Sequence, residues 1–340
     1  MKRLVAAVVL AAAFWAGMAL AGGGDGRPLV LRGPAVTSPL LGLRFGRLDT
    51  WLLRLEPRTL STLPGRRLAL ERYTMGWSFS PDRSRLVFGS QPSSLNDTPA
   101  ALRIVDARTL TTVRQVQLDV DGFAGATHWV ANDRLLALVR SSAPEGDSVL
   151  LVDAAQGRVL SRQPLQGSVA AIGRAKGALV LLLEPPSRGP VSVAVADAAG
   201  SLRVVELARV EAGRSLTEPP NSVLQHDRAG LAVDAATGHA YVVAADAPVG
   251  DVDLSSLAVT YHAPAQPVSV LGRLHDWVEP RARAKEILFC SVRSALWLGD
   301  GRLAVVGVNG TPSWKNGRLS VKSVPSGLQV IDTWDWSSRV

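Results

Sequence analysis

Residues 230–246, GLAVDAATGHAYVVAAD, constrain the fold of this chain more than any other stretch. An apolar run containing Leu231 and Val233 leads into a polar turn that begins at Asp234, and a second apolar run starts at Tyr241. Two β-forming runs around a turn of this composition are a hairpin signal. Because the same pattern recurs along most of the chain, the sequence predicts a protein built from repeated β-hairpins.

The hairpins fall into two kinds that alternate along the chain. In the first kind an acidic residue ends an apolar strand, and its side chain can accept hydrogen bonds from the backbone N–H groups just ahead. These turns begin at Glu56, Asp106, Asp153, Asp197, Asp253 and Asp332. The second kind is centred near Asp82, Asp133, Lys176, Ala235 and Asp300. One hairpin of each kind makes a four-stranded unit of about 45 to 50 residues, which is typical of a β-propeller blade.

Two stretches carry a resemblance to known repeats. Residues 230–246 resemble the YVTN-type β-propeller repeat, and WSFSPDRSRLVFGS at residues 77–90 resembles the FSPDG hairpin of WD40-like and TolB-like propellers. The resemblance extends from about Trp51 to the C-terminus. It implies an all-β propeller of the secreted bacterial type, and it implies no particular function because these propellers host many unrelated activities.

The spacing of the turns predicts the number of blades. About six blades are visible in residues 51–340. The interval between Asp253 and Asp332 is the longest, which predicts a long insertion near residues 263–292. Only a short strand can follow Asp332. Either the segment at residues 22–50 supplies a ring-closing strand, or the chain is a shortened form of a seven-bladed ring. We favour the second reading, which predicts an open or poorly closed ring.

The N-terminus has the three parts of a secretory signal. Lys2 and Arg3 precede an apolar stretch, and Ala19-Leu20-Ala21 fits a small-residue cleavage site. We therefore predict a signal peptide at residues 1–21 and a secreted or extracytoplasmic protein in the cell envelope. An uncleaved membrane anchor is the alternative, and only in that case would the chain contact the membrane.

The charge balance narrows the class of partner. The sequence has 37 Lys and Arg against 29 Asp and Glu, for a formal net charge of +8. Such an excess has two readings: codon bias, since Arg greatly outnumbers Lys, or attraction to a partner, which would be a protein or an anionic component of the envelope. No basic run is interleaved with aromatic residues, so we do not expect nucleic acid binding. The single cysteine, Cys290, follows apolar residues and is read as a buried thiol, and no cofactor is expected.

The longer connections indicate which face of the propeller binds. In a blade of four antiparallel strands the two tight turns lie at one end, and the other connections lie at the opposite end. The long connections are expected at residues 89–100, 208–229, 263–292 and 309–318, all at that opposite end. Loops on a rigid scaffold are the usual place for binding residues.

Candidate binding residues on these connections are of two types. Tryptophan and arginine are enriched among the residues that dominate interface energies. The candidates of this type are Trp277, Trp314, Arg214, Arg281 and Arg283. Adjacent imidazole and carboxylate groups can serve metal binding or acid–base chemistry, and equally they can form an ordinary solvated loop. They are His226 with Asp227 and His275 with Asp276. Trp314 is either an exposed anchor or packed over the blade below it.

No set of residues has the order or spacing of a catalytic group, so no catalytic residue is assigned. The sequence favours a binding or scaffold module that acts through its long-loop face, rather than an enzyme. The alternative is a lactonase-like or other metal-assisted hydrolytic propeller, which would need at least three carboxylate or imidazole groups converging at the loop end of the central channel. Whether any metal binds is left open by the sequence.

Overall fold

The computed structural model describes residues 40–45, 50–70, 73–91, 99–141, 146–216, 224–263, 288–315 and 318–339. These residues form strands β1 to β24 and the turns between them, with no helix in the described ranges. The chain divides into two compact units, one of residues 1–44 and 51–68 and the other of residues 45–50 and 69–340. The predicted all-β class is confirmed.

The first unit is built on a three-stranded sheet in the order β1-β2-β3. Its strands are β1 (Leu40–Phe45), β2 (Thr50–Leu55) and β3 (Leu68–Leu70). The turn after β2 is fixed by Glu56, whose Oε2 accepts hydrogen bonds from the backbone N–H groups of Arg58 and Thr59 at 2.9 and 2.5 Å. This is the first of the acidic turns that the sequence predicts.

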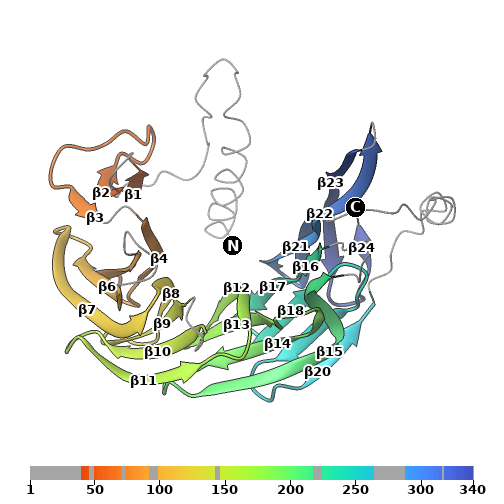
Figure 1. Ribbon diagram of the computed structural model, residues 1–340. Helices are drawn as coiled ribbons and strands as arrows, with labels where there is room; N and C mark the ends of the chain where they lie inside the picture. Colours follow the sequence, from red (N-terminus) through yellow and green to blue (C-terminus); the bar gives the residue numbers. More distant parts are fainter. Residues whose placement is uncertain are drawn as a thin grey trace. The chain divides into compact units, whose positions relative to one another are not determined.

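Groups of four consecutive antiparallel strands, each a propeller blade, make up most of the second unit and follow one another in chain order (Figure 1). The first blade comprises β4 (Tyr73–Phe79), β5 (Arg85–Gln91), β6 (Pro99–Asp106) and β7 (Thr111–Asp121). The second comprises β8 (Phe123–Trp129), β9 (Arg134–Arg140), β10 (Ser148–Asp153) and β11 (Arg158–Pro164). The third comprises β12 (Ser168–Ala175), β13 (Ala178–Glu184), β14 (Gly189–Ala196) and β15 (Leu202–Leu216).

After the third blade a short strand, β16 (Leu224–Arg228), precedes the fourth. The fourth blade comprises β17 (Gly230–Asp234), β18 (His239–Val243), β19 (Val249–Asp253) and β20 (Val259–His262). The fifth comprises β21 (Leu288–Gly299), β22 (Arg302–Lys315), β23 (Arg318–Asp332) and β24 (Ser338–Arg339). The five blades, with the three-stranded sheet, agree with the predicted architecture of about six units, and ring closure stays a prediction.

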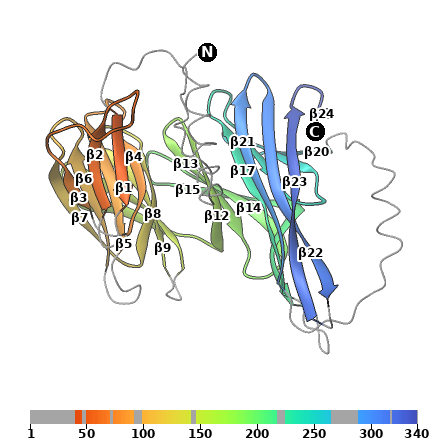
Figure 2. The ribbon, with the colours of Figure 1, turned by 90° about the horizontal axis from the view of Figure 1, so that it is seen from above.

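Strand β16 joins the third and fifth blades into one nine-stranded sheet. It pairs antiparallel with the C-terminal end of β15, residues 213–216, and parallel with β21. Where a loop was expected at residues 208–229, residues 208–216 and 224–228 are strand. The same correction applies to residues 309–318, which lie mainly in the long hairpin of β22 and β23 (Figure 2). In both places the chain continues its backbone hydrogen bonds beyond the blade, which satisfies polar groups that a loop would leave to water.

The acidic turns form as the sequence predicts. Asp106 Oδ1 accepts hydrogen bonds from the N–H groups of Arg108 and Thr109 at 2.9 and 2.6 Å. Asp153 and Asp253 make the same pair of bonds to the residues two and three positions ahead. The aspartate side chain thus stabilises the turn, because it accepts hydrogen bonds from backbone N–H groups that lie within the turn and outside the strand pairing.

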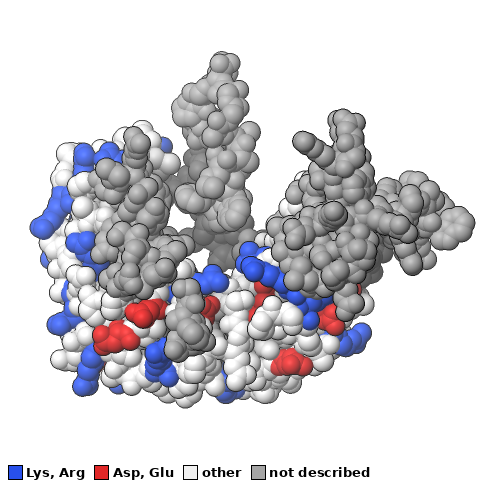
Figure 3. Space-filling view, viewed as in Figure 1, with Lys and Arg blue, Asp and Glu red and all other residues white. Residues whose placement is uncertain are grey.

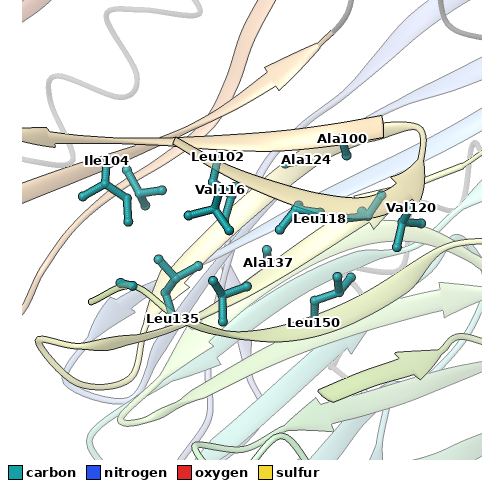
Figure 4. Close-up of a cluster of buried hydrophobic side chains, with 14 of the residues drawn as sticks. Ala100, Leu102, Ile104, Val116, Leu118, Val120, Ala124, Leu135, Ala137 and Leu150 are labelled. Carbon is teal, nitrogen blue, oxygen red and sulfur yellow. The ribbon is translucent and has the colours of Figure 1, made fainter. Parts of the chain in front are cut away.

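The hydrophobic core lies between successive blades. One cluster fills the space between the first and second blades, where Leu102 and Leu118 face Leu135 and Leu150 (Figure 4). Further clusters lie between the second and third, third and fourth, and fourth and fifth blades. Because β9 and β13 pack on both faces, their side chains form continuous buried runs rather than an alternating pattern.

Each complete blade has two distinct ends. The turns from first to second strand and from third to fourth strand are tight and lie at one end. The connections from second to third strand lie at the opposite end, for example residues 185–188. We call this opposite end the connection face.

Candidate ligand-binding site

A cavity of about 400 Å³ opens on the connection face between the second blade, the third blade and β16. Its lining mixes charged residues with apolar ones, and several elements contribute to it. The lining residues are Arg140, Ser168, Val169, Glu184, Pro185, Pro186, Gly213, Arg214, His226 and Arg228. This volume lies within the range of small-molecule sites.

Strand ends place the polar groups around the cavity. Arg140 is the last residue of β9, Ser168 is the first of β12, and Glu184 is the last of β13. Ser168 and Glu184 are paired across two neighbouring strands. Gly213 has a φ of 105°, and a Cβ there would lie 2.9 Å from the carbonyl oxygen of Ser187. Only glycine allows the extension of β15 to approach the loop at this point.

Arg140 is held in place by a buried carboxylate. Its Nε lies 3.6 Å from Asp147 Oδ2, and one of its terminal nitrogens donates to the carbonyl of Val169 at 3.1 Å. Asp147 is 7% exposed and also accepts hydrogen bonds from the N–H groups of Ser141 and Val169 at 3.2 and 3.4 Å. The Arg140 guanidinium is therefore a fixed positive group with its own counterion.

Glu184 and His226 form the centre of the lining. Glu184 Oε2 lies 3.5 Å from His226 Nε2, whereas its Oε1 is buried without a hydrogen-bond partner. The whole residue is 5% exposed. A buried carboxylate oxygen without a donor costs free energy, since the lost hydration is not replaced. Glu184 is thus an acceptor prepared for a donor that the described protein does not supply.

Two arginines bring uncompensated positive charge to the cavity. Arg214 and Arg228 are exposed, and neither forms an ion pair with a carboxylate of the described residues. Arg228 donates to the backbone carbonyl of Ala170 at 3.5 Å. Lys and Arg side chains are spread over the molecular face in Figure 3, with Asp and Glu in smaller groups. The cavity therefore favours a ligand that carries negative charge.

A second ion-pair network adjoins the cavity. Arg188 contacts Asp227 Oδ2 at 3.5 Å and Glu211 Oε2 at 3.6 Å. Its backbone N–H donates to the carbonyl of Arg214 at 2.6 Å, which ties the loop after β13 to the extension of β15. The register pairs Gly213 with Asp227 in β16. Asp227 consequently supports the wall of the cavity and does not line it.

The structure brings three of the sequence-predicted residues together. Arg214 and His226 line the cavity as directly paired residues of β15 and β16, and Asp227 lies beside them. Trp314 lies in β22, where it pairs with Leu319 of β23. The remaining candidates lie outside the described residues, and they are Trp277, His275, Asp276, Arg281 and Arg283.

Sequence reasoning missed Arg140, Glu184, Arg188 and Arg228. A signal was present for two of them, because Arg140 and Glu184 each end an uninterrupted apolar strand. A charged residue that directly follows a strand buried on both faces lies at the rim of the sheet. That observation, applied to every blade, would have placed both residues on the connection face.

A second polar cluster lies between the fourth and fifth blades. His239 Nδ1 lies 2.7 Å from Asp251 Oδ1, and His262 Nε2 lies 3.8 Å from the other oxygen of Asp251. The His262 ring stacks on Trp336 with centroids 3.7 Å apart. Burial lowers the pKa of His262, although the nearby Asp251 acts in the opposite direction. These contacts link two blades, and the sequence analysis did not anticipate them.

The described ranges contain no group of three or more His, Cys, Asp or Glu side chains placed to hold a metal ion. Nor do they include a helix long and apolar enough to cross a membrane.

Comparison with known proteins supports the fold. No protein-family model matches the sequence, and a search of curated proteins finds no match. Among solved structures, the dihydro-heme d1 dehydrogenase NirN in complex with DHE is similar, with a TM-score of 0.53 and 15% identity. The match covers 92% of this chain and 55% of that chain, so this chain spans little more than half of that protein.

The comparison with solved structures also finds two further proteins. Sqt1 of Saccharomyces cerevisiae has a TM-score of 0.51 and 7% identity, over 89% of this chain and 70% of that chain. The β-propeller domain of the Trilobed protease from Pyrococcus furiosus has a TM-score of 0.40 and 9% identity, over 84% and 75%. The likeness to NirN and to Sqt1 concerns the fold only, because the sequence identities are low. The fold and the site together define a β-propeller with a polar cavity on its connection face.

Proposed function

We propose that this chain is an extracytoplasmic binding module whose connection face holds an anionic partner without transforming it. The observation that carries the proposal is the cavity, where Arg214 and Arg228 have no carboxylate partner among the described residues and lie beside the buried Glu184. Uncompensated guanidinium groups recognise carboxylate or phosphate groups by charge-assisted hydrogen bonds. The repeat pattern resembling the YVTN type and the signal-like N-terminus support a place in the cell envelope.

The partner is a protein or another anionic component of the envelope. The formal net charge of +8 and the exposed arginines favour association with a negatively charged surface. Charged groups at the rim of an interface act mainly on the association rate and on its salt dependence. Capture of the partner should therefore weaken as the salt concentration rises.

The experiment is a pull-down from the host envelope with the full secreted chain. Wild type is compared with the double variant Arg214→Met and Arg228→Met, which keeps the length of the side chains and removes both charges. The control is Arg134→Met, which removes an exposed arginine at the tight-turn end of β9. The Trp277→Ala and Trp314→Ala variant tests the predicted aromatic anchors.

We expect the arginine variant to lose partners that the control retains, and we expect added salt to imitate the loss. Identical partners for wild type and the arginine variant would contradict the proposal. Turnover of lactones or esters by the purified protein in a metal-dependent way would replace it with the hydrolytic alternative.

A further inference from the structure

The cavity on the connection face contains two kinds of groups that a ligand could bind: a hydrogen-bond acceptor without a donor, and cationic side chains without a carboxylate partner among the described residues. Glu184 is buried, and one of its carboxylate oxygens has no donor. Arg214 and Arg228 carry positive charge without a carboxylate partner in the described part of the chain. The acceptor favours a ligand with a hydrogen-bond donor, and the cationic side chains favour a ligand with an anionic group.

We infer that the cavity binds a small organic acid that also carries a hydroxyl or ammonium donor. The carboxylate of the ligand pairs with Arg214 and Arg228, and its donor bonds to the Glu184 carboxylate. The inference rests on the proposed function, since it names the ligand class of the same site. A terminal group of this kind on a polymer or a protein would be recognised in the same way as the free molecule.

Electrostatics requires both groups on one ligand. A simple anion would gain from the arginines but would lie beside the negative Glu184, and like charges at close range repel. A simple cation or a neutral alcohol would satisfy Glu184 but would gain no attraction from the two guanidinium groups, which would stay hydrated. A molecule that joins an acid to a donor satisfies both sides with charge-assisted hydrogen bonds.

The geometry of the lining suits such a molecule. Rotation about the terminal bond of Glu184 is soft, so either carboxylate oxygen can turn toward a donor. His226, 3.5 Å from Oε2, limits this motion from one side. Pro185 and Pro186 add rigid apolar surface beside the polar groups. The cavity of about 400 Å³ accommodates a single sugar acid or amino acid.

The test measures binding of four small molecules to the full chain by titration calorimetry. D-glucuronate joins a carboxylate to hydroxyl donors, and L-alanine joins a carboxylate to an ammonium group. Acetate and D-glucose each supply one half of the pattern. We expect glucuronate or alanine to bind at least about tenfold more tightly than acetate and glucose, because each charge-assisted bond contributes about that factor. Which of the two binds identifies the donor.

Variants test the contact of Glu184 with the ligand's donor separately from the contact of the two arginines with its carboxylate. Glu184→Gln keeps the shape of the side chain and removes its charge, and it should reduce the advantage of the two-group acid over acetate by about tenfold. The variant Arg214→Met with Arg228→Met should reduce binding of every acid and leave glucose unchanged. Arg134→Met, at the other end of β9, should change nothing. Because the comparison of ligands on wild type needs no substitution, the inference stays testable even if Glu184→Gln does not fold.

The possible results separate this inference from the proposed function. If acetate binds as tightly as both two-group acids, or if none of the four molecules binds, the inference is wrong. In that case, arginine-dependent and salt-sensitive capture of an envelope partner would still support the proposed function. If a two-group acid binds in a Glu184-dependent way but no partner is captured, the inference stands and the proposed function fails.

Discussion

A few buried polar side chains in the described residues have one atom without a hydrogen bond. Besides Glu184, the described residues include His128, whose Nε2 is buried without a hydrogen bond. His128 lies in β8 near Arg174, whose guanidinium donates to the carbonyl of Thr127 at 3.2 Å. Burial lowers the pKa of His128, the charge of Arg174 lowers it further, and a backbone hydrogen bond involving Ala175 partly opposes them.

The His128 environment predicts a pH-dependent stability. Because the pKa of His128 in the folded protein lies below its value in the unfolded chain, the neutral form is favoured by folding. The stabilising contribution is complete above the unfolded pKa of about 6.5 and is lost as the pH falls toward the lower folded pKa. The melting temperature should therefore drop between about pH 7.5 and pH 5.5.

The substitution His128→Asn isolates this contribution. Burial also lowers the pKa of His262, so wild type contains two histidines that act in the same direction. We expect thermal unfolding of His128→Asn to depend less on pH over this range than that of wild type. An unchanged pH dependence would show that His128 does not become charged on unfolding in this window.

At the scale of the turn, a substitution of Asp234 measures how much an aspartate side chain stabilises a hairpin turn. Its Oδ1 accepts from the N–H of Ala236 at 3.0 Å, its Oδ2 accepts from the Thr237 hydroxyl at 2.5 Å, and the residue is buried. We expect Asp234→Ala to destabilise the protein by about 1–2 kcal/mol, because the bonded donors lose their acceptor. Chemical denaturation measures the difference in free energy of unfolding.

A matched control tests whether the loss comes from the turn. Asp133 also lies in a tight turn, but its carboxylate is exposed and has no partner among the described residues. Asp133→Ala should change the free energy of unfolding by less than about 0.5 kcal/mol. Equal effects of the two substitutions would show that the aspartate side chain does not stabilise these hairpins through its hydrogen bonds.

The turns were predictable from the sequence because each is a local event. The hydrogen bonds of Asp106 reach only residues two and three positions ahead, so the residue types within one short stretch decide them. The alternation of two turn types then gave the four-stranded blade. By contrast, the pairing of β16 with β21 joins segments far apart in sequence, and no local pattern specifies it.

The candidate site was predicted only where it follows a connection. Arg214 and His226 were found because they lie on a segment longer than the other connections of the repeat. Arg140 and Glu184 were missed because their side chains converge from two different blades. Such convergence depends on the strand register and on the packing of one blade against the next, and neither is encoded near those residues.

Across the second unit, the position of a side chain relative to the stacked blades should determine how much its truncation lowers the free energy of unfolding. Leu181 in β13 is fully buried between the second and third blades, whereas Leu328 in β23 is 56% exposed. We expect Leu181→Ala to lower the free energy of unfolding by about 2–5 kcal/mol, because it leaves a cavity in the core. The same change at Leu328 should cost less than about 1 kcal/mol, since little apolar surface is buried there. Similar losses at both positions would mean that Leu328 is covered in solution.

The free energy of local opening should differ between the blades of the second unit, and hydrogen exchange can measure this difference. Strand β13 is buried on both faces by its neighbours. The fifth blade packs on the fourth through Leu303 and Val305, but its other face exposes Val306 and Leu328.

Backbone pairing is continuous in both places, over residues 179–183 of β13 and over residues 302–306 of β22. Hydrogen bonding alone would therefore give similar protection. Local opening of the fifth blade loses packing on one face only, so its amides should exchange with a smaller free energy of opening than those of β13. Exchange followed by mass spectrometry should show peptides from β22 and β23 exchanging earlier than peptides from β13. Equal protection would contradict the prediction and would show that another part of this chain, or a second copy, covers the face of Val306 and Leu328.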